Sequence, residues 1–151
     1  MPSYPSSLPC ALHTEYGLNH VSPLMRVDLQ SGRARQRRRF TSVPSMANVS
    51  WVMNNAQAAL FEAWFRWTIN DGASWFDMPL KTPMGYQDYD CRFAGMYDGP
   101  KLIGAGRWTF TAMLEIRERQ TFSEEWTTIM PDYIAEMDIF DLAMNREWPL
   151  P

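Results

Sequence analysis

The sequence predicts a mainly β (α+β) fold: an antiparallel β-sandwich or small barrel with one packed helix at about residues 55–70 and a C-terminal helical extension at about residues 132–145. Several short runs alternate apolar and polar residues, as half-buried strands do. Eleven prolines and eight glycines in 151 residues indicate many turns, which favours β structure over a helical bundle. One aromatic stretch between two alternating runs has helical spacing instead.

The chain is long enough for one domain with a substantial core, since 46% of its residues are hydrophobic and 14% aromatic. We divide it into an N-terminal arm (1–23), a β domain (24–119) and an acidic C-terminal helical extension (120–151). The arm is rich in Pro and Ser and lacks sustained periodicity. We therefore expect it to be irregular, either fraying or lying along a neighbour, and both ends to become ordered only on binding neighbours.

Charge is distributed unevenly along the chain. The net charge of -3 argues against generic nucleic-acid binding, which needs a basic excess. Residues 1–40 carry six arginines against two acids, whereas residues 120–151 carry seven acids against Arg146. This asymmetry indicates that the two ends meet each other or different partners.

The first predicted hairpin is unusually basic. Leu24 to Gln30 alternates as a half-buried strand, Ser31-Gly32 turns the chain, and Arg33 to Phe40 returns as the second strand. Five arginines in seven residues do not fit a buried strand. Three interpretations stay open: a solvated edge strand whose charges block pairing, an anchor for carboxylates of an adjoining subunit, or a nucleic-acid contact.

A third strand, Met46 to Met53, leads into the helix, for which Asn54 or Asn55 is the expected N-cap. Apolar side chains at i, i+4, i+7, i+8 and i+11 predict one buried face, formed by Ala56, Leu60, Ala63, Trp64 and Trp67 and widened by Phe61 and Phe65. The expected core of the helix is Leu60, Phe61, Trp64, Phe65 and Trp67. The expected wet face is Gln57, Ala58, Glu62 and Arg66, and Asp71-Gly72 should end the helix.

Further strands are expected at Ala73 to Met78 (closed by Pro79), Tyr86 to Tyr97 and Arg107 to Arg117, with a turn at 82–85 and a loop at 98–106. In the extension, Ser123 is the expected cap of a first helical segment, and Pro131-Asp132 opens a second. Its apolar stripe would be Tyr133, Met137, Phe140 and Met144. Such a helix is marginal alone, so its stripe should dock on the sheet or on another chain.

No catalytic, cofactor-binding or metal site is expected. His13 and His20 both lie in the arm, and Cys10 and Cys91 lack paired spacing, so both should be reduced thiols. Asp88 and Asp90 could form a carboxylate pair, but solvated strand positions are the expected state. No run approaches the length that spans a bilayer, so we expect a soluble protein that folds in a cytoplasm.

The order of motifs resembles a known family. It runs SGRARQRRRF, VSWVM, QAALFEAWFRWTINDGASWFDMPL, CRFAG and RWTFTAMLEIRER, from about Leu24 to Arg119. This resembles the lambda-type phage minor tail proteins and the related distal tail proteins of siphophages and gene transfer agents. In that family an arginine-bearing hairpin precedes a helix that ends in Gly-Gly or Asp-Gly, then an aromatic pair and a proline. Here these are Asp71-Gly72, Trp75-Phe76 and Pro79, and Cys91-Arg92 and Leu114-Glu115 also match.

The resemblance implies a structural protein without enzymatic activity, located in the virion tail after synthesis in the host cytoplasm. Its fold would be a β-sandwich with one helix. Its subunits, commonly six, would form a ring that joins the tail tube to the distal tip or hub complex, leaves the lumen open for DNA in transit, and has no membrane anchor. Its partners would be further copies, the tail tube protein and hub or tip proteins. The alternatives are a tail terminator, a head-to-tail connector ring, or a small carbohydrate-binding module or enzyme that uses Trp75, Trp108, Trp126 and Trp148.

The split charge suggests how such a ring would be held together, because in a heterologous ring each subunit presents one patch to the other patch of its neighbour. The candidate subunit-interface residues on the hairpin are Arg33, Arg35, Arg37, Arg38 and Arg39. Those in the extension are Glu124, Glu125, Asp132, Glu136, Asp138 and Asp141.

Overall fold

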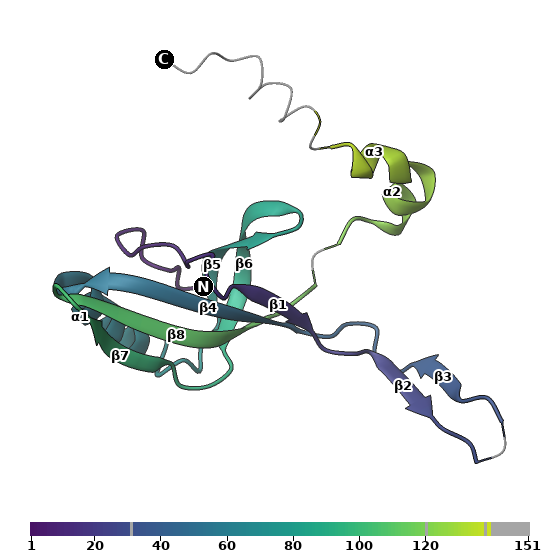
Figure 1. Cartoon of the computed structure of the whole chain (residues 1–151), viewed down its shortest axis with the longest axis horizontal. Helices are drawn as coiled ribbons and strands as arrows, with labels where there is room; N and C mark the ends of the chain where they lie inside the picture. The colour runs from purple at the N-terminus through teal and green to yellow at the C-terminus, as the bar shows by residue number, and fades with distance from the viewer. Residues whose placement is uncertain (31, 120, 138, 140–151) are drawn as a thin grey trace. The chain divides into compact units, whose positions relative to one another are not determined.

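The computed structural model describes residues 1–30, 32–119, 121–137 and 139, and the chain divides into two units, residues 1–119 and 120–151. In the first unit, an antiparallel sheet has the order β1 (Gly17–His20), β4 (Ser45–Asn54), β8 (Arg107–Ile116), β6 (Gly85–Phe93) and β5 (Phe76–Thr82), and β7 (Asp98–Ile103) also pairs with β8 (Figure 1). A separate two-stranded sheet consists of β2 (Leu24–Val27) and β3 (Arg35–Arg38). The prediction of a mainly β, antiparallel fold with a packed helix is confirmed.

Strand β8 organises the large sheet. It pairs with β4 along its whole length, from Ser45 opposite Ile116 to Asn54 opposite Arg107. Its other edge is shared, because β7 pairs with its first half and β6 with its last three residues. The inward side chains of β8 alternate with outward ones, as the sequence predicts, and Phe110, Leu114 and Ile116 are buried.

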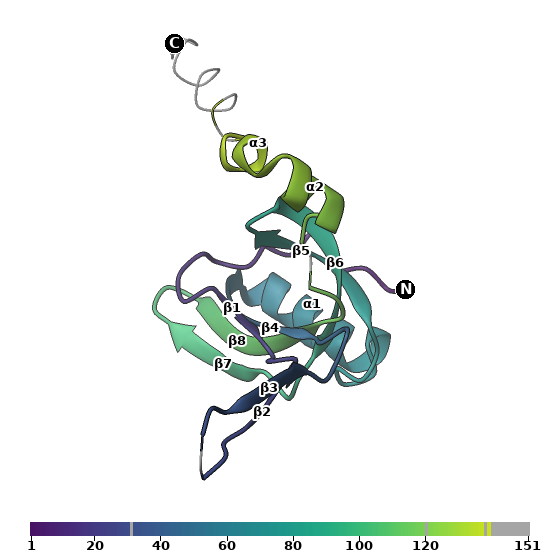
Figure 2. The same ribbon diagram turned by 90° about the vertical axis from the view of Figure 1, so that its right-hand side faces the viewer.

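Helix α1 (Asn55–Ala63) packs on the inner face of this sheet (Figure 2). Asn54 caps it through a capping box: the Asn54 side chain accepts from the Gln57 amide at 2.8 Å, and the Gln57 side chain accepts from the Asn54 amide at 3.1 Å. The helix continues as one π-helical turn, η1 (Trp64–Thr68), in which the Ile69 amide donates to the Trp64 carbonyl. Asn70, Asp71 and Gly72, all with positive φ, then end it.

The buried face of the helix differs from the predicted one. Ala58, Phe61, Trp64, Phe65 and Ile69 are buried, whereas Leu60 is 41% and Trp67 76% exposed. Ala56 and Ala63 are exposed as well. Of the predicted buried face only Trp64, with Phe61 and Phe65 beside it, is in the core, and the prediction of Ala58 as a wet residue is also wrong. Both sides of this helix are apolar, so spacing alone cannot decide which side packs. The extra residue in the π turn also changes the phase, so that Trp64 and Ile69 both reach the core.

The core is a connected set of aromatic rings with Phe61 at its centre. Phe61 lies 4.9 Å from Phe110 and 5.5 Å from Trp51 between ring centroids, so the helix contacts both central strands. Phe65 meets Phe93 of β6 at 5.0 Å, edge to face. These offset and edge-to-face geometries are the favourable ones for aromatic pairs. The helix is thus fixed against β4, β8 and β6 together.

The N-terminal segment has the irregular backbone that the sequence predicts, but it packs into this core, which corrects the expectation that it frays or becomes ordered only on a neighbour. Tyr4 and Leu8 are buried, and β1 pairs with the first half of β4. The Tyr4 amide donates to the Asp77 carbonyl at 2.8 Å, which ties the segment to the free edge of β5. The anchoring side chains have no regular spacing because the backbone is mostly irregular, so periodicity does not reveal them.

Two further expectations about strands are corrected. Pro79 lies inside β5 rather than closing it, which is tolerated because β5 is at the edge of the sheet and needs no amide there. The expected loop at 98–106 contains strand β7. Gly99 and Pro100 coincide with a shift in its register between Asp98 and Lys101, so residues typical of a turn mark an irregular edge strand here.

The second unit contains α2 (Glu124–Ile129) and α3 (Pro131–Ala135). The Ser123 hydroxyl accepts from the Trp126 amide, as the sequence predicts, and Pro131 opens α3. Phe140 and Met144 of the predicted stripe lie outside the described residues. Within the described part of the chain, no helix is both long and apolar enough to cross a membrane.

Candidate interaction surface

The β2–β3 hairpin combines aliphatic and arginine side chains on both of its faces. Met25 lies opposite Arg37 and Val27 opposite Arg35, and directly opposed residues project to the same side of an antiparallel pair. Leu24 and Arg38 form the equivalent pair on the other side. Arg35, Arg37 and Arg38 therefore each stand beside an apolar side chain.

The guanidinium groups of this hairpin have spare donor capacity. Arg37 contacts the Met25 sulfur at 3.8 Å, Arg38 donates to the carbonyls of Phe40 and Thr41, and Arg39 lies over the Phe40 ring. Among the described residues, no carboxylate lies within ion-pair distance of any of the five candidate arginines, Arg33, Arg35, Arg37, Arg38 and Arg39. All five are exposed, and each guanidinium carries five N–H donors.

Apart from Met25 and Ala34, which are partly buried, the apolar side chains of the hairpin are exposed. The strand expected at 24–30 therefore has no buried face, which corrects the prediction of a half-buried strand. Leu24, Val27, Leu29 and Phe40 are each about half exposed. No other strand of the described chain pairs with β2 or β3. An isolated two-stranded hairpin is at best marginally stable in water. The hairpin thus has the composition of a surface that a partner covers.

The second unit exposes the opposite charge. Glu124, Glu125, Asp132 and Glu136 are all exposed, whereas Asp138 and Asp141 lie outside the described residues. The unit also exposes the large apolar side chains of Trp126, Ile129, Met130 and Tyr133. A pocket of about 200 Å³ is lined by Glu125, Trp126, Ile129 and Met130. The sequence signal for this pocket is the i, i+3, i+4 spacing of its three apolar residues.

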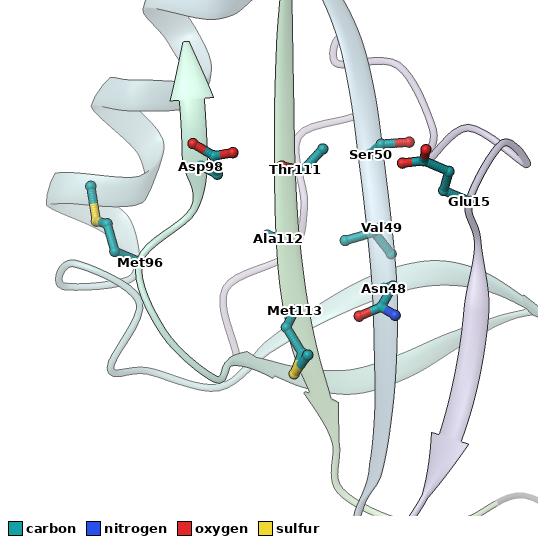
Figure 3. Close-up of a pocket in the computed structure, with 9 residues that line it drawn as sticks. All are labelled: Glu15, Asn48, Val49, Ser50, Met96, Asp98, Thr111, Ala112 and Met113. Carbon is teal, nitrogen blue, oxygen red and sulfur yellow. The ribbon is translucent and has the colours of Figure 1, made fainter. Parts of the chain in front are cut away.

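A second, larger pocket of about 400 Å³ lies on the outer face of β4 and β8 (Figure 3). It is lined by Asn48, Val49, Ser50, Thr111, Ala112, Met113, Met96, Glu15 and Asp98. Figure 3 shows Asp98 on one side of the two strands and Glu15 on the other. Asp98 is paired with the Lys101 ammonium group, and no hydrogen bond joins it to Glu15 in the described structure.

The candidate carboxylates of β6 are placed differently from a catalytic pair. Asp88 is exposed and lies opposite Pro79, whereas Asp90 lies opposite Asp77. Desolvation, together with the hydrogen bond and charge repulsion from Asp90, raises the pKa of Asp77. Arg117 approaches Asp90 at 3.6 Å and offsets part of this repulsion. Within the described residues, no group of three or more His, Cys, Asp or Glu side chains is placed to hold a metal ion.

The remaining candidates lie apart from one another. His20 shares a hydrogen bond with Ser45 at 2.7 Å, Cys10 is exposed and Cys91 is buried. Among the tryptophans considered for sugar stacking, Trp75 is covered by the guanidinium groups of Arg92 and Arg117. Trp108 donates its indole N–H to Asn55, Trp126 is half exposed, and Trp148 lies outside the described residues.

The sequence identifies an apolar stripe on the helix but places it in the core, whereas part of it is exposed. Leu60 and Trp67 belong to it, and Arg66 lies over the Trp67 ring at 4.9 Å.

Neither a protein-family model nor a curated protein sequence matches the chain.

Proposed function

We propose that this chain is a structural subunit of an oligomeric ring in a phage tail, where it joins the tail tube to the distal tip or hub complex. The observation that carries the proposal is the β2–β3 hairpin, in which exposed arginines without carboxylate partners in the described chain stand beside exposed aliphatic side chains. A surface of this kind gains most from burial against an acidic partner, because arginine binds carboxylates in bidentate fashion.

The positions of the motifs support the proposal. Asp71-Gly72 ends the helical segment, Phe76 enters the core next to Trp64, and the ion pair of Arg92 with Glu115 joins β6 to β8. The motifs that carry the resemblance to phage tail proteins therefore include residues that close the β domain around its helix. This is the part of a ring subunit that must hold its shape while its surfaces contact neighbours.

The proposed ring is homo-oligomeric and expected to be hexameric, with the tail tube protein and hub or tip proteins as axial neighbours and DNA passing only through the lumen. A ring needs two different surfaces on each subunit. The basic hairpin and the acidic second unit supply such a pair of opposite charge.

Labelling the protein in intact particles tests the proposal. A gold-conjugated antibody against a C-terminal tag should mark one ring at the distal end of the tail, and cryo-electron microscopy should give its subunit number. Label at the head-proximal end would instead support a tail terminator or head-to-tail connector. Particles without the protein would contradict a virion role.

A sugar-binding role is the remaining alternative, and among the described tryptophans considered for it Trp126 is half exposed. Titration of a glycan panel against tryptophan fluorescence tests it. A saturable micromolar response that Trp126→Ala abolishes would favour this role over the structural one.

A further inference from the structure

We infer that the β2–β3 hairpin of one copy docks on the α2–α3 unit of a second copy, with an aliphatic side chain of the hairpin in the Trp126–Ile129–Met130 pocket and the neighbouring arginines on the carboxylates around it. The inference deepens the proposed ring function, on which it rests, by naming the partner of the hairpin and the residues that receive it.

The pocket has the size and composition for such an anchor. Trp126, Ile129 and Met130 are apolar and supply most of its lining. The pocket is an open surface hollow of about 200 Å³ between these exposed side chains, so an aliphatic side chain of a partner can lie in it. Burying such a side chain is the usual centre of a stable contact, with charged groups around it.

The acidic residues around the pocket are complementary in charge to the arginines of the hairpin. Glu125 lines the pocket and is exposed, and Asp132 at the start of α3 is exposed as well. On the hairpin, Val27 lies opposite Arg35 and Met25 opposite Arg37, so an aliphatic group and a guanidinium project together. Insertion of Val27 or Met25 would therefore bring an arginine to the acidic rim.

The charge of the chain favours a second copy as the occupant. Residues 24–40 hold six arginines against Asp28, and residues 120–151 hold seven acids against Arg146. Asp28 is itself paired with Arg26 at 3.0 Å, so it does not neutralise the arginines of β3. Each copy thus carries one basic and one acidic surface. Contacts between copies would run head to tail, as closure of a ring demands.

A charge exchange on the purified full-length chain tests the contact. The hairpin variant carries Arg35→Glu and Arg37→Glu, and the helix variant carries Glu125→Arg and Asp132→Arg. All four positions are exposed, so both variants should keep the urea midpoint of the β domain. Because Glu125 and Asp132 lie in the first turns of α2 and α3, the circular dichroism spectrum of the helix variant checks that these helices persist. Sedimentation velocity at low salt should show oligomers of the wild type, and each variant alone should associate about a hundredfold more weakly or worse, because like charges then face each other.

The mixture of the two variants gives the decisive result. A reversed hairpin then meets a reversed helix unit, and the unaltered surfaces meet each other, so the equimolar mixture should assemble like the wild type. Asp88→Lys, which reverses an exposed acid on β6 instead, should leave assembly unchanged. Ile129→Asn, at an exposed position that lines the pocket, should weaken assembly without changing the charge of either surface.

Three outcomes would overturn the inference: variants that associate like the wild type, a mixture that stays dissociated, or a wild-type chain that is monomeric up to about 1 mM. Failure of the ring function is separate from these. Rescued assembly in the mixture together with particles that lack the protein would leave the contact standing and refute the tail role. A labelled tail ring that both variants still build would refute the contact alone.

Discussion

The ring of Tyr4 stands edge-on against the ring of Trp64, with centroids 5.6 Å apart and planes at 85°. This contact joins the fourth residue of the chain to the first residue of the π turn. The Tyr4 hydroxyl donates to the Pro9 carbonyl at 2.8 Å, and burial raises the pKa of the phenol. The N-terminal segment therefore closes one side of the aromatic core.

Replacing Tyr4 by alanine should lower the free energy of unfolding by about 3 kcal/mol, because a large buried ring is removed from contact with Trp51 and Trp64. Urea denaturation measures the change. Leu12→Ala, in the same segment but partly exposed, should cost less than about 1 kcal/mol. A loss for Tyr4→Ala as small as that for Leu12→Ala would mean that the Tyr4 ring does not contribute to the core.

Trp64 and Trp67 form a matched pair on one helical segment. Trp64 is buried against Phe76, with centroids 5.1 Å apart, so Trp64→Ala should cost about 3–5 kcal/mol. Trp67→Ala should change stability by less than about 0.5 kcal/mol, because its side chain is exposed. Thermal and urea unfolding of both variants check this difference. A larger effect at Trp67 would restore the helical face predicted from spacing.

Gly72 should not tolerate a side chain. Its φ is +84°, and a Cβ there would lie 3.1 Å from both the Phe65 ring and the Phe93 Cβ. Gly72→Ala should therefore destabilise the fold by about 1–3 kcal/mol through backbone strain and crowding. Gly95→Ala, where no atom lies within 4 Å of the new Cβ, is the control and should be nearly neutral. The urea midpoints of the two variants would coincide if the helix stop could relax.

The parts of the fold that the sequence predicted are those set by local rules. The Asn54–Gln57 capping box, the alternation of β8 and the stop after Ile69 each depend on residues close together in the chain. The buried face of the helix depends instead on which apolar side finds the sheet. The side that carries Phe61 is buried because its ring contacts both Trp51 and Phe110. No spacing rule contains that information.

For the candidate interaction surface, too, the sequence predicts some features and not others. Arginines such as Arg35 and Arg37 are exposed, as five charges in seven residues require, and the carboxylates of the second unit are exposed for the same reason. The pocket beside Glu125 could not be predicted from composition. It depends on where Trp126, Ile129 and Met130 are placed at the end of α2, before α3 begins. The spacing of these residues indicates a shared face but not a cavity.

The buried thiol of Cys91 should make the fold sensitive to alkali. Burial, with a smaller effect of the negative charges of Asp90 and Asp77, raises the pKa of Cys91 to about 12 from an ordinary value of about 9. Above pH 9 the unfolded chain loses this proton while the folded chain keeps it, so stability falls as pH rises towards 12. The loss from this group should be about 1 kcal/mol between pH 9 and pH 10. Urea unfolding at a series of pH values measures the slope. In Cys91→Ala the lost side chain lowers the free energy of unfolding by the same amount at every pH. The control is therefore the slope of stability against pH, which should be shallower in this variant than in the wild type. An unchanged slope would show that folding does not raise the pKa of Cys91.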